Sequence, residues 1–392
     1  MPWKEISAME ERRGFLVEWL GREVGMAELC RRYGISRVTG YKWVGRFEKE
    51  GWTGLQDQSR APQHPWNGVA EEVEELIVKG RRDHPTWGPR KLLPWLRCQY
   101  GRQDDWPVAS TVGEILKRHG LVRARKRRRR ATPSAKPLRT GGQPNAVWCA
   151  DFKGWFRTGD GKRCDPLTIS DAYSRYLLRC QGMSNTKGER VQGLFEAVFR
   201  EYGLPEVIRT DNGAPFASTG LGGLSRLSVW WIKLGIKPER IAPGKPYQNG
   251  SHERMHRTLK MEAINPPART LRGQQRCFDR FREEYNQQRP HEALGQVPPA
   301  RYYESSGRTY RGRVPAVEYP EGFRIRKVKF HGDLQWRGRR VYLTQALAGQ
   351  PVGLMQIDDR HWEIYFSEVL LGILDSHRME ISQPRETAGG EE

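Results

Sequence analysis

The sequence predicts a multidomain chain with all-α modules at its N-terminus, an α/β core with a mixed sheet in the centre and a small, barrel-like β domain at its C-terminus. At 392 residues the chain is longer than one ordinary hydrophobic core requires. Apolar residues recur at helical spacing before about residue 122, and they gather in strand-like runs from Ala146. After Tyr302 they alternate with basic residues in short strands, which indicates a third kind of domain.

Changes in composition and periodicity divide the chain into six segments. A run of basic residues separates the helical part from the α/β part, and a polar stretch ends the chain. The segments that we expect are a first helical module at 1–60, a second at 61–122, a basic linker at 123–145, the α/β core at 146–302, a basic β domain at 303–382 and a polar tail at 383–392.

The first module has the pattern of a helix-turn-helix. Residues 11–50 read as helices, and Ser36 is placed to cap a helix that continues through Phe47. We expect Tyr41, Val44 and Phe47 to point inward. The outward, DNA-binding face then carries Arg37, Thr39, Lys42 and Arg46. A helix, a short turn and a helix with a basic outer face are typical of DNA recognition. The alternative is an ordinary three-helix bundle.

The second module, at about residues 70–122, has the same pattern of a helix, a turn and a helix. Thr111 is expected to cap its last helix, with Glu114 three residues later as in a capping box, and Gly120 is expected to end that helix. The sequence therefore predicts a second helix-turn-helix.

Residues 123–130 hold seven basic side chains in eight positions. Such a run is a solvated linker unless an anion binds it, and its place beside DNA-binding modules favours contact with phosphates. The residues that we expect to bind DNA there are Arg125, Lys126, Arg127 and Arg128.

The central segment predicts alternating strands and helices. The expected order is strands at 147–156, 163–171 and 174–182 in an antiparallel meander, an amphipathic helix at 191–202, a strand at 206–210, a helix near 223–234, a strand near 237–241 and a helix that carries Glu253. This order puts Asp151 on the first strand and Asp211 just past the fourth.

Asp151, Asp211 and Glu253 are the candidate catalytic and metal-binding residues. Mg²⁺ prefers carboxylate oxygens and is often shared with substrate phosphates, so a few carboxylates from separate elements suffice to hold it. Two such ions, Mg²⁺ or Mn²⁺, can activate an attacking oxygen and stabilise the leaving one. The pattern predicts metal-dependent phosphoryl transfer on nucleic acid. Of the other nearby acids, we expect Asp171 to be a turn residue, and Asp160 and Asp165 to be surface or hairpin groups.

A competing pattern overlaps Glu253. Residues His252-Glu253-Arg254-Met255-His256 satisfy H-E-x-x-H, which in metalloproteases places two zinc ligands one helical turn apart. The surrounding helix is strongly cationic, with Arg257 and Lys260, and a pattern with three fixed positions arises readily by chance. A third histidine, His291, could face the site, but we expect it to be a satisfied structural residue.

The charge of the chain indicates a polyanionic partner. Lys and Arg total 67 against 46 Asp and Glu, which gives a formal net charge of +21. DNA, RNA and an anionic membrane surface all fit this charge. No apolar stretch approaches the ~20 residues of a spanning helix, and the first residues lack the order of a signal peptide, so we expect a cytoplasmic protein. The six cysteines form no C-x-x-C pair and are expected to be reduced thiols.

Several stretches together resemble the integrase core of bacterial insertion-sequence transposases, which are similar to retroviral integrases. They are Trp148-Cys-Ala-Asp151, Arg209-Thr-Asp211-Asn-Gly, Pro246-Tyr-Gln-Asn-Gly250, Glu253 through Lys260, and Tyr285 through Leu294 with Pro298-Pro299. The resemblance implies a ribonuclease H-like core whose metal ligands are Asp151, Asp211 and Glu253. It also implies DNA contacts from Lys260, and Arg257 lies on the same helical face.

The resemblance implies a DNA transposase that cleaves at element ends, frees 3′-hydroxyls and joins them to target DNA. Its partners would be double-stranded DNA, as terminal inverted repeats and target, and further copies of the chain, in the bacterial cytoplasm on the nucleoid and without a membrane. A structure-specific nuclease and a helix-turn-helix transcriptional regulator are the alternatives. One departure is that 41 residues separate Asp211 from Glu253, more than is usual, and residues 218–224 are a natural place for the extra ones.

Overall fold

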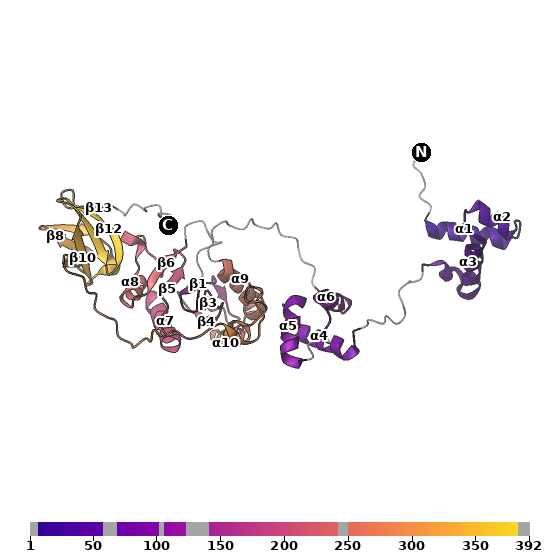
Figure 1. Ribbon diagram of the computed structural model, residues 1–392, viewed down its shortest axis with the longest axis horizontal. Coiled ribbons are helices and arrows are strands. Elements are labelled where there is room, and N and C mark those ends of the chain that lie inside the picture. The colour runs from indigo at the N-terminus through magenta and orange to yellow at the C-terminus, as the bar shows by residue number, and fades with distance from the viewer. Residues whose placement is uncertain (1–6, 58–68, 102–105, 123–140, 242–249, 383–392) are drawn as a thin grey trace. The chain divides into compact units, whose positions relative to one another are not determined.

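The computed structural model describes residues 7–57, 69–101, 106–122, 141–241 and 250–382 (Figure 1). Contacts divide the chain into two compact units, Met1–Val69 and Ala70–Glu392. Among the described residues, no helix has both the length and the apolar character that crossing a bilayer requires.

The first unit is a three-helix domain made of α1 (Ala8–Gly21), α2 (Met26–Arg32) and α3 (Arg37–Glu50), followed by a 3₁₀ turn at Gly51–Leu55. Ser36 caps α3 as expected, since its hydroxyl accepts a hydrogen bond from the Thr39 backbone N–H at 3.1 Å. Val44 is buried, but the expectation that Tyr41 points inward is wrong, because its side chain is 59% exposed. The helix meets the core at Gly40, where a Cβ would lie only 2.7 Å from Cys30 Sγ, and Tyr41 is therefore turned toward solvent.

The second helical module consists of α4 (Glu71–Asp83), α5 (Pro89–Tyr100) and α6 (Ala109–Arg118). The predicted capping box is wrong. Val108 is the N-cap of α6, and Thr111 already lies inside the first turn. Starting the helix at Ala109 buries Val112, Ile115 and Leu116, so core packing decides its start. Gly120 follows the end of the helix with a φ of +67°, as expected of a residue that stops one.

The core holds a mixed sheet, as predicted. Its strands are β1 (Val147–Phe152), β2 (Phe156–Arg157), β3 (Arg163–Asp171), β4 (Leu177–Met183), β5 (Val207–Thr210) and β6 (Lys237–Arg240). The order is β2-β3-β1-β5-β6, and β4 also pairs with β3. β1, β3 and β4 form the predicted antiparallel meander, and β5 and β6 are added parallel to β1.

Helices cover both faces of this sheet (Figure 1). On one face α7 (Gly188–Tyr202) and α8 (Arg226–Lys233) pack through aromatic side chains such as Phe195 and Trp231. On the other face lie α9 (Gly250–Leu259), a π-helical turn at Lys260–Ile264 and α10 (Leu271–Gln287). Neighbouring residues of β4 point to opposite faces, with Leu178 in the first core and Leu177 in the second.

The C-terminal part is a β domain. Its strands are β7 (Arg324–Lys327), β8 (Asp333–Trp336), β9 (Arg339–Tyr342), β10 (Pro351–Gln356), β11 (His361–Phe366), β12 (Val369–Asp375) and β13 (Glu380–Ser382). The expectation of a barrel is wrong for the described residues. The sheet order β13-β12-β11-β10-β7 is open, and β8 and β9 form a separate hairpin. The apolar face needs no closure, because the hairpin and helix α8 of the core share one hydrophobic cluster with it.

Residues 218–224, where the extra residues between Asp211 and Glu253 are expected, contact the β domain. Leu224 lies in the cluster that the β domain forms with Val229 and Ile232 of α8. Gly220 approaches Thr344 so closely that a Cβ would lie 2.6 Å from the Thr344 hydroxyl. This segment therefore helps to attach the β domain to the core.

Candidate active site

Two neighbouring strands place two of the predicted carboxylates together. β1 and β5 run parallel with Cys149 opposite Arg209. Asp151 and Asp211 each follow two residues later, so the same register brings them side by side. Neighbouring strands lie about 4.8 Å apart, a distance that side chains with carboxylates readily bridge through a shared cation.

The charges of the other two carboxylates act on Asp151. Burial is the largest of the causes that raise the pKa of Asp151 to about 7, and the negative charges of Asp211 and Glu253 contribute in the same direction. Glu253 lies on the exposed side of α9. Three acids that repel one another are a donor set suited to a hard divalent cation, which would offset their charge.

Two buried histidines fix the orientation of helix α9 against the sheet. His252, Met255, His256 and Leu259 face the sheet, while Glu253, Arg254, Arg257 and Lys260 are exposed. The helix thus presents an acidic residue and a basic stripe on the same outward side. Because a helix repeats every 3.6 residues, burying His252 and His256 fixes the direction in which Glu253 points.

One hydroxyl connects these histidines to strand β1. Thr168 Oγ1 donates to the Asp151 carbonyl oxygen at 3.1 Å and lies 2.7 Å from Nε2 of both His252 and His256. A threonine hydroxyl has a single proton, so it must accept from both imidazoles, which are then neutral with the proton on Nε2. Burial lowers the pKa of His252 to about 3 and that of His256 further, in agreement with this assignment.

The same geometry explains the H-E-x-x-H pattern. Ligand atoms of Asp151, His252 and His256 all lie within 4.8 Å of one another, so these residues are a possible metal cluster. However, the Thr168 hydroxyl already lies between the two Nε2 atoms, and Ser170 Oγ lies 3.0 Å from His252 Nδ1. Zinc bound at about 2.0–2.1 Å by Nε2 would have to displace Thr168. The contacts are those of structural histidines.

The other acids of the meander have structural partners. Asp171, expected to be a turn residue, accepts hydrogen bonds from the Asn145 and Ser174 backbone N–H groups and from the Ser174 hydroxyl. Asp160 accepts from the Thr158 hydroxyl in its hairpin. A surface position for Asp165 is wrong, since its side chain is 4% exposed and forms a two-point ion pair with Arg163.

The expected DNA-binding residues fall into three groups. Arg37 and Lys42 of α3, and Arg257 and Lys260 of α9 and the turn after it, are exposed. Thr39 and Arg46 are partly buried. The Thr39 hydroxyl lies 2.9 Å from Ser36 Oγ, and the Arg46 guanidinium lies 5.1 Å from the centre of the Trp43 ring. Arg125, Lys126, Arg127 and Arg128 lie outside the described residues.

Thr168 and Ser170 were not among the predicted site residues. Both are buried polar residues at alternate positions of β3, and both contact a helix more than 80 residues away in sequence. The signal in the sequence is the pair of hydroxyl side chains in Thr168-Ile-Ser170, at alternate positions of the strand. That pattern indicates buried polar groups that need partners, but it does not identify them.

Comparison with known families agrees with this fold. The Integrase core domain family matches residues 141–246 and 234–299. A Helix-turn-helix domain matches 11–63 and a Homeodomain-like domain matches 39–116. The C-terminal domain of IS481 family transposases matches 323–382.

Individual relatives come from bacterial insertion elements. The chain is 27% identical over 235 residues to an uncharacterized 39.2 kDa protein of element IS476 from Xanthomonas euvesicatoria, an alignment that covers 60% of this chain and 65% of that protein. It is 29% identical over 243 residues to a 31.7 kDa protein of element IS407 from Burkholderia multivorans, and this alignment covers 62% of this chain and 82% of that protein. It is 27% identical over 309 residues to transposase InsD of element IS2-9 from Escherichia coli, and this alignment covers 72% of this chain and 94% of that protein.

The solved structures that align with the chain include retroviral integrases, at low similarity. The chain in a simian T-cell lymphotropic virus intasome, in complex with a PP2A regulatory subunit, aligns with a TM-score of 0.38 and 16% identity, over 75% of this chain and 97% of that one. The HTLV-2 integrase catalytic core in complex with magnesium aligns with a TM-score of 0.34 and 17% identity, over 42% and 99%.

The family matches define the class of the protein. The chain carries an integrase core domain, which places it among the metal-dependent polynucleotidyl transferases. Within that class it is similar to insertion-sequence transposases, and residues 323–382 match the C-terminal domain of the IS481 family.

Proposed function

We propose that this protein is a DNA transposase that binds the ends of an insertion element, cleaves them to free 3′-hydroxyls and joins these to target DNA. The proposal is supported by the parallel pairing of β1 and β5, which puts Asp151 and Asp211 on or next to adjacent strands, and by the charges of Asp211 and Glu253, which act on Asp151. The joining of two ends would bring together several copies of the chain on double-stranded DNA, in the bacterial cytoplasm at the nucleoid.

Divalent cations complete this proposal. Asp151, Asp211 and Glu253 fit Mg²⁺ or Mn²⁺, because the partly buried carboxylate of Asp151 has a raised pKa, which a bound cation would lower. We propose two ions. When bound, they would supply charge for the phosphate and a lowered pKa for the attacking hydroxyl or water. The chain itself contributes positioning: Thr168 fixes the backbone at Asp151, and the two histidines fix α9.

The exposed cations of α9 complement this site. Arg257 and Lys260 lie four and seven residues after Glu253, so they share its side of the helix. We propose that they hold the phosphates next to the cleaved bond. Arg37 and Lys42 of α3, at the other unit, would read the element end.

The proposal is tested by removing each carboxylate charge. We expect Asp151→Asn, Asp211→Asn and Glu253→Gln each to abolish cleavage and joining of element-end DNA, because an amide keeps the shape but loses the charge that a hard cation needs. Binding of the ends, measured by fluorescence anisotropy, is expected to stay near the wild-type level. Thermal unfolding with and without Mn²⁺ gives a second readout, and the variants should lose the stabilisation that the cation gives to the wild type.

Asp160→Asn is the matched control, since Asp160 is an exposed acid of the neighbouring hairpin. Joining by any of the three variants within about tenfold of the wild type would remove that residue from the site. Cleavage by the wild type without any joining, over a range of DNA ends, would favour a nuclease instead.

A further inference from the structure

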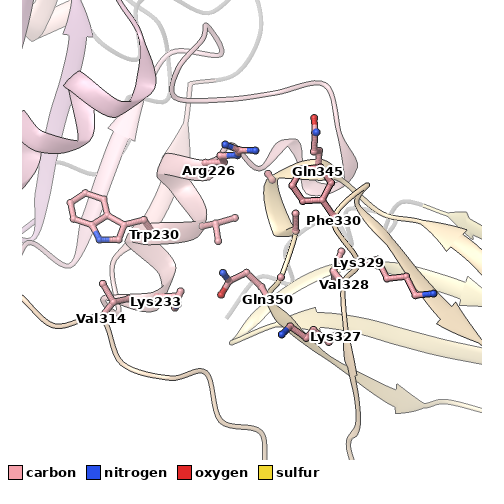
Figure 2. A pocket seen from close by; sticks show the side chains of 14 residues that line it. Arg226, Trp230, Lys233, Val314, Lys327, Val328, Lys329, Phe330, Gln345 and Gln350 are labelled. Carbon is pink, nitrogen blue, oxygen red and sulfur yellow. The ribbon is translucent and has the colours of Figure 1, made fainter.

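A cleft lies between helix α8 of the core and the β domain, away from the three carboxylates in the sequence (Figure 2). Its volume is about 780 Å³. The core side is formed by residues of α8 that include Arg226, Trp230 and Lys233, and the β-domain side includes residues 327–330 and 348–350. Because Val229 and Val328 belong to the hydrophobic cluster that joins the two parts, the two walls are held against each other.

The charge of the cleft is of one sign. Four of its 14 lining residues are cations, Arg226, Lys233, Lys327 and Lys329, and none of those lining residues is acidic. Within the described part of the chain, no ion pair neutralises any of the four, although Lys329 Nζ donates to Gln335 Oε1 at 3.1 Å. Figure 2 shows the Lys327 side chain directed toward the cleft beside Gln350. Walls of low dielectric concentrate this potential, so an anionic ligand is favoured.

The cleft also exposes an aromatic ring. Phe330 is 76% exposed, whereas Val229, Val328 and Trp230 at the cleft are 7% exposed or less. Figure 2 shows Phe330 and Arg226 at the same end of the cleft, on its two opposite walls. A basic groove with an exposed aromatic ring is how proteins bind single-stranded nucleic acid, since phosphates lie on the cations and a base stacks on the ring. A base in a duplex does not offer its face in this way.

We propose that the cleft binds an unpaired segment of a DNA strand, with its phosphates at Arg226, Lys233 and Lys327 and a base stacked on Phe330. This inference rests on the proposed function, because cleaving one strand of a duplex releases an end that can unpair. It assigns to the junction of core and β domain a role separate from phosphoryl transfer. The ligand is recognised by its charge and by the flat face of a base rather than by its sequence.

The test compares two variants of the cleft with two matched controls in the full-length protein. Phe330→Ala and Lys327→Glu change the cleft. Tyr342→Ala and Arg339→Glu change an exposed aromatic and an exposed cation of the same β domain that do not line it. The probes are an oligothymidylate and a duplex of the same length, and dissociation constants are measured by fluorescence anisotropy at fixed salt concentration.

We expect Phe330→Ala to weaken oligothymidylate binding by about tenfold, the size typical of losing one base–aromatic stack, and to leave duplex binding unchanged. Lys327→Glu should weaken single-strand binding by at least as much. Both controls should bind both probes like the wild type. Ultraviolet crosslinking of the oligothymidylate should modify the peptide that carries Phe330.

Three results would overturn the inference. The first two are equal losses of affinity for both probes and no loss of affinity in either cleft variant. The third is a change of oligomeric state in Phe330→Ala while single-strand binding stays intact, which would assign the cleft to a second copy of the chain. A wild-type protein that joins no DNA ends would instead contradict the proposed function. The oligothymidylate measurement would still decide whether the cleft binds a single strand.

Discussion

Thr168 shows at the residue scale how a single side chain can hold a strand and a helix together. Its hydroxyl contacts the Asp151 backbone and two histidines of α9, and no short sequence pattern predicts such a contact. Asp151, Asp211 and Glu253 could be proposed from the sequence because each lies in a recognisable local stretch. Thr168 could not, since its partners come from segments that meet only in the folded chain.

His291 leads to a prediction about pH. It was expected to be a satisfied structural histidine, but its Nε2 is buried without a hydrogen-bond partner among the described residues. Burial lowers its pKa to about 3, and the charges of Lys91, Arg289 and Arg175 act in the same direction. A histidine in the unfolded chain has a pKa of about 6.5. Below that pH the unfolded chain therefore binds a proton at His291 that the folded chain does not bind.

The free energy of unfolding should consequently fall as the pH decreases from about 6.5 toward 4. His291 should contribute up to about 1.4 kcal/mol per pH unit to this fall. We expect His291→Gln to remove that part of the slope, as measured by urea unfolding at several pH values. His331→Gln, at an exposed histidine of the β domain, serves as the control and should leave the slope unchanged. A wild-type slope in His291→Gln would show that this histidine does not titrate differently in the two states.

At the scale of elements, helix α3 combines a correct and a wrong prediction. Its start at Ser36 could be predicted, because a cap is a local property of the sequence. The direction of Tyr41 could not, since it depends on the close approach of Gly40 to α2. The wrong capping box of α6 has a similar cause, because burial of its apolar side chains places its start at Ala109.

The exposed face of α3 predicts sequence-specific binding. Arg37→Ala and Lys42→Ala should each cost roughly 1–3 kcal/mol in binding to the element end if the side chain contacts a base edge, with little loss on random DNA. Competition titrations with both DNAs measure this difference. Lys49→Ala, at an exposed lysine in the last turn of the same helix, should change neither affinity. Equal losses on both DNAs would mean that Arg37 and Lys42 contact phosphates only.

The β domain shows where prediction from strand patterns ends. Alternating residues indicated its strands, but they do not say whether a sheet closes. The open order of β13 to β7 is stable because the hairpin β8–β9 and α8 cover its apolar face. That cover comes from a helix nearly 100 residues earlier, which local patterning cannot reveal. Phe330, three residues after the end of β7, is exposed at the cleft.

At the scale of the whole molecule, the net charge of +21 should make DNA binding strongly dependent on salt. The logarithm of the binding constant should fall linearly with the logarithm of the salt concentration, with a slope near −0.9 for each phosphate neutralised. If Arg257 and Lys260 both contact phosphates, the double variant Arg257→Ala/Lys260→Ala should reduce the size of this slope by about two. The exposed Arg280 of α10 offers a control, since Arg280→Ala should leave the slope as it is. An unchanged slope in the double variant would place these two cations away from the DNA.

The order of modules was readable from the sequence, because charge and periodicity change along the chain. The finer division at residues 60, 122, 145 and 302 remains a prediction. How the parts contact one another was not readable, because a segment such as 218–224 looks like an ordinary glycine-rich loop. Its contacts with Thr344 and the β domain appear only in the folded chain.

This attachment has a consequence for anyone who wishes to study the catalytic part in isolation. A fragment ending near Tyr302 would leave Leu224, Val229 and Ile232 facing water, since the residues that cover them belong to the β domain. Contiguous apolar surface of this kind promotes aggregation, so poor behaviour of such a fragment would say nothing about its chemistry. A shortened protein that keeps residues 70–382 retains the cover. Where a related protein lacks the glycine-rich segment, its terminal domain must be fastened by different contacts, or it must move independently.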